Sequence, residues 1–89
     1  MAIQIHPNGT SDTVLPSEGQ RFTLKELQSI VGGYVERLML LETGLVMYIN
    51  EEGTIMGLPA NPVASMIFGR PLVGEVIVGS PLELDGSDA

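Results

Sequence analysis

The segment from residue 22 to residue 36 constrains the fold most strongly, because it predicts a complete helix followed directly by a strand. Thr23 and Glu26 have the spacing of a capping box, in which a hydroxyl and a carboxylate bond the first free amides of a helix. Apolar side chains then recur on one helical face at Leu24, Leu27, Ile30 and Val31. Gly32 suits the left-handed conformation that ends a helix. We therefore expect the main helix over about residues 24–31.

The remaining elements are predicted to be short. Strand patterns cover residues 2–6, 34–41, 45–49 and 72–78, with weaker signals at 13–15 and 54–56. Glu42-Thr43-Gly44 suits a tight hairpin, and the Asn50-Glu51-Glu52-Gly53 turn places a glycine where a positive φ is expected. Asn61 and Pro62 predict the cap and first residue of a second short helix, over about residues 62–68. The expected class is α+β, with a mostly antiparallel sheet.

The chain divides into three stretches. Residues 1–21 form a strand and a polar connection, residues 22–79 form the α+β core, and residues 80–89 form an acidic tail that we expect to fray. A chain of 89 residues allows a single domain with a modest core. Its apolar content is 44%, which for so short a chain favours a homodimer or a higher oligomer.

Charge and composition exclude several classes of function. Acidic residues outnumber basic ones by 11 to 4, and the net charge is −7. Nucleic-acid binding needs cationic side chains, and the four available are scattered: Arg21, Lys25, Arg37 and Arg70. We therefore expect no direct binding of nucleic acid. We also expect a cytoplasmic protein without membrane attachment, because no apolar run is long enough to span a bilayer and no signal peptide is visible.

The sequence shows no catalytic or metal-binding set of residues, and it has no cysteine. His6 is the single histidine, and no orienting partner or second ligand is visible beside it. Glu51 and Glu52 could form half of a carboxylate metal site, but a solvated turn also explains them. The helix that Asn61 opens could meet an anion, although capping is the simpler interpretation. We expect no enzyme activity, cofactor or metal.

Tyr34 and Glu36 are the first candidate binding residues. On a strand they share one face, because alternate side chains point the same way. An aromatic ring beside a carboxylate could hold a base, a sugar or an arginine of a partner. The structural alternative places Tyr34 in the core and pairs Glu36 with an arginine such as Arg37 or Arg70.

The segment Leu27-Gln28-Ser29-Ile30-Val31-Gly32-Gly33-Tyr34-Val35-Glu36 resembles the signature of a small uncharacterised domain family of bacteriophages, prophages and plasmids. Matching segments follow in the same order: Asn50-Glu51-Glu52-Gly53, Leu58-Pro59-Ala60-Asn61, and Gly74-Glu75-Val76-Ile77-Val78-Gly79. The resemblance covers about residues 22–79. It adds Asn50, Glu51, Glu52 and Asn61 to the candidate binding residues, unless these segments form only a helix end and turns.

The resemblance implies an origin more than a mechanism, because membership of a family does not give a function. Small phage proteins often inhibit host defence, as anti-CRISPR proteins do, or sequester its signalling nucleotides. We therefore expect a non-enzymatic accessory protein that binds a bacterial defence protein in the host cytoplasm. The alternative is a binder of a small ligand such as a signalling nucleotide, which the scarcity of cations disfavours. An enzyme has the least support.

Overall fold

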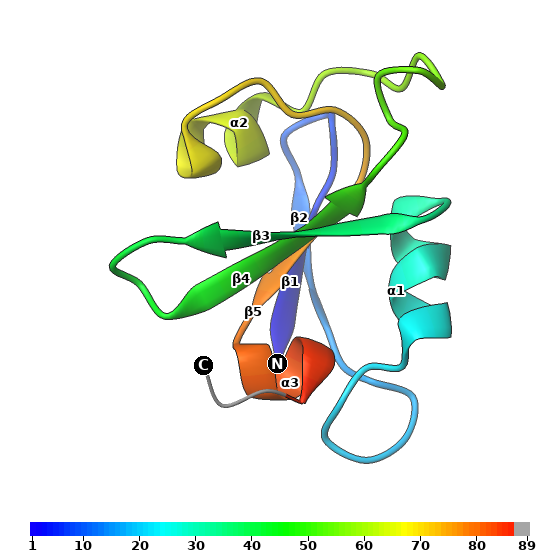
Figure 1. Ribbon diagram of the computed structural model, residues 1–89, viewed down its shortest axis with the longest axis vertical. Coiled ribbons are helices and arrows are strands. Elements are labelled where there is room, and N and C mark those ends of the chain that lie inside the picture. The colour runs from blue at the N-terminus through cyan, green and yellow to red at the C-terminus, as the bar shows by residue number, and fades with distance from the viewer. Residues whose placement is uncertain (87–89) are drawn as a thin grey trace.

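The computed structural model describes residues 1–86, which form a five-stranded antiparallel sheet and three short helices (Figure 1). The strands are β1 (Ala2–Ile5), β2 (Ser11–Val14), β3 (Val35–Leu40), β4 (Leu45–Asn50) and β5 (Val76–Gly79), and the helices are α1 (Leu24–Val31), α2 (Pro62–Phe68) and α3 (Pro81–Asp85). The strand order is β2-β1-β5-β4-β3, so that β2 and β3 lie at the edges. The expected α+β class is confirmed.

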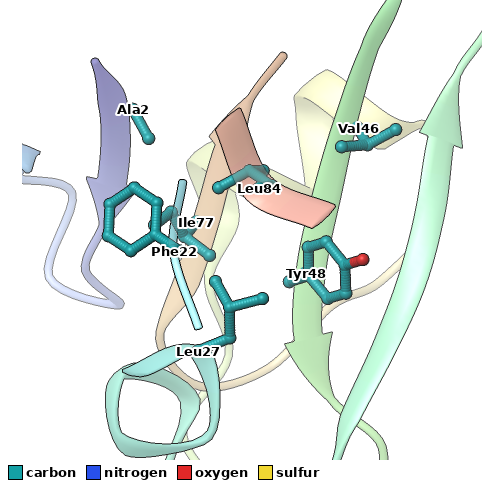
Figure 2. Close-up of a cluster of buried hydrophobic side chains, with 7 residues drawn as sticks. All are labelled: Ala2, Phe22, Leu27, Val46, Tyr48, Ile77 and Leu84. Carbon is teal, nitrogen blue, oxygen red and sulfur yellow. The ribbon is translucent and has the colours of Figure 1, made fainter. Parts of the chain in front are cut away.

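The sheet is apolar on both faces, because successive side chains of a strand point to opposite sides. On β4, Val46 and Tyr48 belong to one core cluster, and Met47 and Ile49 belong to the other. The first cluster includes side chains of α1 and α3 (Figure 2): Ala2, Phe22, Leu27, Val46, Tyr48, Ile77 and Leu84. The second includes a side chain of α2: Leu38, Leu40, Met47, Ile49, Ala64, Leu72 and Val76. The helices therefore form two separate layers.

The predicted capping of α1 is confirmed. Thr23 Oγ1 accepts a hydrogen bond from the Glu26 amide at 3.1 Å, and Glu26 Oε1 accepts one from the Thr23 amide at 2.9 Å. The amides of Thr23 and Ser17 bond the carboxylate and lower the pKa of Glu26 to about 2. The stability that this carboxylate adds is therefore present above its ordinary pKa of 4.5 and is lost as the pH falls through about 2. Gly32 ends the helix with a φ of 83°.

The second helix and the hairpin are also confirmed. Asn61 caps α2 and Pro62 begins it. β3 and β4 pair continuously from Val35↔Asn50 to Leu40↔Leu45.

The predicted strand at 54–56 is wrong, because residues 51–57 fold into consecutive turns. The Met56 amide donates to the Glu52 carbonyl at 2.9 Å, and the Gly57 amide donates to the Thr54 carbonyl at 3.1 Å. Gly53 does not take the expected positive φ. In this segment the positive φ, of 71°, belongs to Gly57. The small size of Gly53 has a packing reason instead, since a Cβ there would lie 2.7 Å from Val73 Cγ2.

Two strand boundaries also differ from the prediction. β2 begins at Ser11, before the expected 13–15. β5 begins only at Val76, because the chain before it pairs with the loop preceding α2. In that pairing the Asn61 amide donates to the Leu72 carbonyl at 2.9 Å, and the Gly74 amide donates to the Pro59 carbonyl at 2.8 Å.

The frayed tail expected from residue 80 is wrong over residues 80–86, where α3 packs against the first core cluster. Ser80 caps the helix, and the Phe22 amide donates to the Glu83 carbonyl at 2.8 Å. Asp85 accepts hydrogen bonds from Arg37 Nε at 2.5 Å and from the Tyr48 hydroxyl at 3.0 Å. A helix this short has too few residues to show a helical period. The last part of the predicted tail, residues 87–89, lies outside the described residues.

The two leucines of α3 give a matched test of this packing. Leu84 is completely buried and Leu82 is 61% exposed, although they belong to the same helix. We expect Leu84→Ala to lower the free energy of unfolding by about 2–5 kcal/mol, because it removes a fully buried side chain. We expect Leu82→Ala to change it by less than about 0.5 kcal/mol. Urea unfolding measures both, and equal small effects would contradict the docking of α3.

Candidate functional site

The structure places the candidates Tyr34 and Glu36 at two different hollows of the surface. Tyr34 is 66% exposed and therefore does not pack in the core. It lines a hollow with Gly32, Gly33, Glu52 and Met56, among others.

Glu36 lines a second hollow, of about 260 Å³, together with Asn50, Glu51 and Arg70. Arg70 Nη2 lies 3.9 Å from Glu36 Oε2, which is the pairing that the structural alternative anticipates. The Arg70 guanidinium also lies over the Phe68 ring, 5.1 Å from its centre. Two carboxylates and one guanidinium thus share this hollow, and Tyr34 is not among its lining residues.

Asn50 is buried, and its side chain bonds the end of α1 to the turn after β4. Its Nδ2 donates to the Val31 carbonyl at 3.1 Å, and its Oδ1 accepts from the Glu52 amide at 2.8 Å. Gly33 leaves the necessary room, because a Cβ there would lie 3.0 Å from Asn50 Nδ2. The Gly-Gly and Asn-Glu-Glu-Gly segments therefore meet as one structural unit, in which Asn50 satisfies a helix-terminal carbonyl.

Asn61 is completely buried and joins three segments of the chain. Its Nδ2 donates to the carbonyls of Ile5 at 3.0 Å and Gly74 at 2.9 Å, and its Oδ1 accepts from the Ala64 amide at 3.1 Å. Both amide hydrogens and the oxygen are therefore used within the fold. This candidate binding residue has a structural role.

Asn61→Asp tests that role with a nearly isosteric change. A carboxylate can still accept the hydrogen bond from the Ala64 amide. It cannot donate to the carbonyls of Ile5 and Gly74, and its buried negative charge would be repelled by their oxygens. We expect the free energy of unfolding to fall by at least about 3 kcal/mol. Asn8→Asp, at an exposed turn residue, is the control. A denaturation midpoint for Asn61→Asp that matches this control would contradict the structural role.

His6 lies between two carboxylates in a cluster that the sequence did not reveal. Its Nδ1 is 2.6 Å from Glu75 Oε1, and its Nε2 is 2.6 Å from Asp12 Oδ2. Gln4 Nε2 also donates to Glu75 Oε1, at 3.0 Å. The expectation that His6 has no carboxylates beside it is thus wrong. The β1–β2 hairpin brings Asp12 close, and the pairing of β1 with β5 brings Glu75 close from a distant part of the sequence.

This arrangement leaves neither ring nitrogen of His6 open to a metal or a nucleophile. Within residues 1–86, no three His, Asp or Glu side chains are grouped so that they could hold a metal ion. The hydrogen bond with Asp12, followed by that with Glu75, raises the pKa of His6 above its ordinary value of 6.5. The cluster therefore links β1, β2 and β5 best when His6 carries a proton.

The pH dependence of this link has a definite sign. A raised pKa in the folded state means that the contribution to stability is complete below pH 6.5 and is lost as the pH rises through the folded-state pKa. We expect the imidazole titration to lie above 6.5, and to move down in Asp12→Asn and in Glu75→Gln. Proton NMR resolves it directly, because the chain has one histidine. A midpoint at or below 6.5 in the wild type would contradict the arrangement.

Two larger hollows lie elsewhere on the surface. One, of about 750 Å³, lies between the connection at residues 15–21 and α3, and Arg21 is among its lining residues. The other, of about 430 Å³, is the hairpin–α2 hollow, lined by Met39, Leu40, Leu41, Thr43, Ile67 and Phe68. Thr43 is the one lining residue with a polar side chain, so the hairpin–α2 hollow is lined mainly by apolar side chains.

The fold and surface define a small α+β domain whose sheet lies between two layers of helices, and in which Gly33, Asn50 and Asn61 have structural roles. The chain matches the family described as "Domain of unknown function (DUF3846)" over residues 3–87, and it belongs to that family. The match takes in most of β1 and all of β2 and α3, which lie outside the segment that carries the sequence resemblance. No curated protein and no solved structure gives a significant match. Among residues 1–86, no helix has the length and apolar character required to cross a membrane.

Proposed function

We propose that this DUF3846 domain acts by binding a protein partner through the hairpin–α2 hollow, without catalysing a reaction. The observation that supports this proposal is the exposure of large apolar side chains around the hollow. Leu41 is 81% exposed and Ile67 is 48% exposed, although they come from the β3–β4 hairpin and from α2. Apolar area in contact with water is unfavourable. Grouped in a concave surface, it is typical of a site that a partner covers.

The hollow has the features that a protein side chain from a partner would need. Leu40 and Phe68 form its less exposed lining, while Leu41 and Ile67 reach into solvent beside them. Glu42 stands next to Leu41 at the hairpin turn and adds an acidic group at the edge of this surface. An apolar centre with a polar rim is the usual anatomy of a protein interface. A partner with an apolar side chain and a neighbouring basic group would fit.

The polar groups best suited to chemistry are engaged within the fold, which favours binding over catalysis. Both ring nitrogens of His6 face carboxylates, and the Asp85 carboxylate accepts from Arg37 and Tyr48. Burial, and then the bond to Asp85, raises the pKa of Tyr48, so its hydroxyl stays protonated. A general base or nucleophile needs a group that is free to take up or share a proton.

The identity of the partner rests on the resemblance to a domain family of phages and plasmids. A small binding protein carried by such elements acts most usefully on the host's immunity. We therefore propose a bacterial defence protein as the partner and inhibition as the outcome, in the manner of an anti-CRISPR protein. The site of action would be the host cytoplasm.

A phage-plating assay with matched variants tests this proposal. Bacterial strains that each carry one defence system express the chain and are challenged with a sensitive phage. We expect the wild type to restore plating in at least one strain by at least about tenfold, roughly 1.4 kcal/mol on the scale of an equilibrium constant. Ile67→Lys should abolish this effect, because it places a charge in the apolar hollow. Ile55→Lys, at a residue 86% exposed in the 51–57 turns, should retain it.

Thermal melts of both variants keep the assay interpretable, since each must remain folded. Two results would overturn the proposal: no strain responds to the wild type, or Ile67→Lys inhibits defence as well as Ile55→Lys does.

A second candidate function is the binding of a small ligand such as a signalling nucleotide, and the larger hollow favours it. Its volume of about 750 Å³ lies within the range of small-molecule sites. Arg21 could meet a phosphate there. Two other arginines are engaged elsewhere, Arg37 with Asp85 and Arg70 with Glu36 and Phe68. Thermal melts of the wild type with a panel of nucleotides separate the two candidates. A nucleotide that binds the folded state raises the melting temperature, and such a rise would favour the small-ligand function.

A further inference from the structure

β3 presents a regular row of backbone hydrogen-bonding groups at the edge of the sheet. Its pairing with β4 extends to Tyr34, whose carbonyl accepts from the Glu51 amide at 2.8 Å. In an antiparallel pair, residues whose backbone bonds the neighbouring strand alternate with residues whose backbone points away. The even-numbered residues of β3 therefore bond β4. The N–H and C=O groups of Val35, Arg37 and Met39 point outward.

This row is open in the part of the chain that the structure describes. Across residues 1–86, no hydrogen bond beyond the β3–β4 ladder involves the backbone of Val35, Arg37 or Met39. Proteins usually protect such an edge with charged side chains, especially lysine, or with a proline or a bulge. β3 has no lysine, proline or bulge, and its two charged side chains, Glu36 and Arg37, are each paired within the chain. The opposite edge, β2, is short, polar and exposed along Ser11-Asp12-Thr13.

We propose that β3 pairs antiparallel with β3 of a second copy of this chain, so that two five-stranded sheets join into one. The outward residues are spaced evenly on either side of Arg37. A two-fold axis through Arg37 and normal to the sheet therefore aligns all three with outward residues of the other copy. Each Val35 then lies opposite the other copy's Met39. Both strands gain the full set of edge hydrogen bonds.

Under that two-fold axis, the side chains at the β3 edge of one copy match those at the β3 edge of the other copy. Met39 is 56% exposed and Val35 is half-buried. The two-fold axis creates two equivalent Val35–Met39 pairs, and each pair removes apolar area from water. Apolar cross-strand pairs stabilise a sheet. A second copy supplies both residues at the required positions, which is why we choose it over an unrelated strand.

Charge also favours self-pairing at this edge, although the chain carries a net charge of −7. Arg37 would meet Arg37 of the other copy, but Asp85 already accepts a hydrogen bond from each guanidinium. On the other face, Glu36 lies near Arg70. The edge is thus nearly neutral, and two acidic molecules meet less repulsion here than at most of their surface.

Mass measurement across a concentration series tests the pairing. We expect light scattering to show a species of twice 9.5 kDa that dissociates on dilution. Met39→Pro removes an outward N–H and no bond to β4, so it should stay folded and become a monomer. Met39→Lys should weaken association by at least about tenfold and serves if the proline variant unfolds. The control is Met66→Lys, the same substitution at a methionine of α2 that is 84% exposed, and this variant should remain a dimer.

A cysteine crosslink tests the register, because the natural chain has no cysteine. Facing residues of a hydrogen-bonded antiparallel pair have Cα atoms about 5.5 Å apart, within reach of a disulfide. We expect Arg37→Cys to form a covalent dimer on mild oxidation, and Thr13→Cys at the β2 edge to form far less. A monomer at all concentrations, an unchanged mass in both Met39 variants, or equal crosslinking at the two positions would overturn the proposal. None of these readouts depends on activity against host defence.

Discussion

Burial of both faces of β4 is the constraint on which the rest of the structure depends. Val46 and Met47 are neighbours in sequence, and both are almost completely removed from water, on opposite sides of the sheet. A sheet face must be covered by another element, and this chain covers both faces with helices. α1 and α3 contribute to one layer and α2 to the other, so even a helix as short as α3 becomes part of the core.

The parts of the fold that the sequence predicts well are those with local causes. The cap, face and end of α1 lie within a few residues of one another, and Asn61-Pro62 identifies the start of α2 in the same way. The prediction failed for α3 because one turn of helix has no readable period, and because the burial of Leu84 depends on strands far away in the sequence. It failed at residues 54–56 because apolar Ile55 and Met56 suggest a strand, while the backbone closes turns on itself.

In the candidate site, too, the sequence predicts what has a local cause and misses what depends on distant segments. Strand alternation predicted only that Tyr34 and Glu36 share one face of a strand, and their separate hollows depend on how the 51–57 turns and Arg70 pack. Asn50 and Asn61 drew attention as signature residues, and each proved to bond backbone groups of other segments. The His6 cluster could not be predicted from the sequence, because its second carboxylate belongs to Glu75, which is 69 residues away along the chain. Asn50 and Asn61 thus belong to the scaffold.

The position of β5 has a consequence for how the chain reaches its fold. β5 is the last strand in the sequence, yet it lies between β1 and β4 and joins the hairpin β1–β2 to the hairpin β3–β4. On the ribosome, both hairpins emerge before the strand that unites them. Each must wait with an inner edge unpaired until residues 76–79 leave the exit tunnel. Such long-range pairing slows folding, so this small domain completes its sheet only after residues 76–79 have been made.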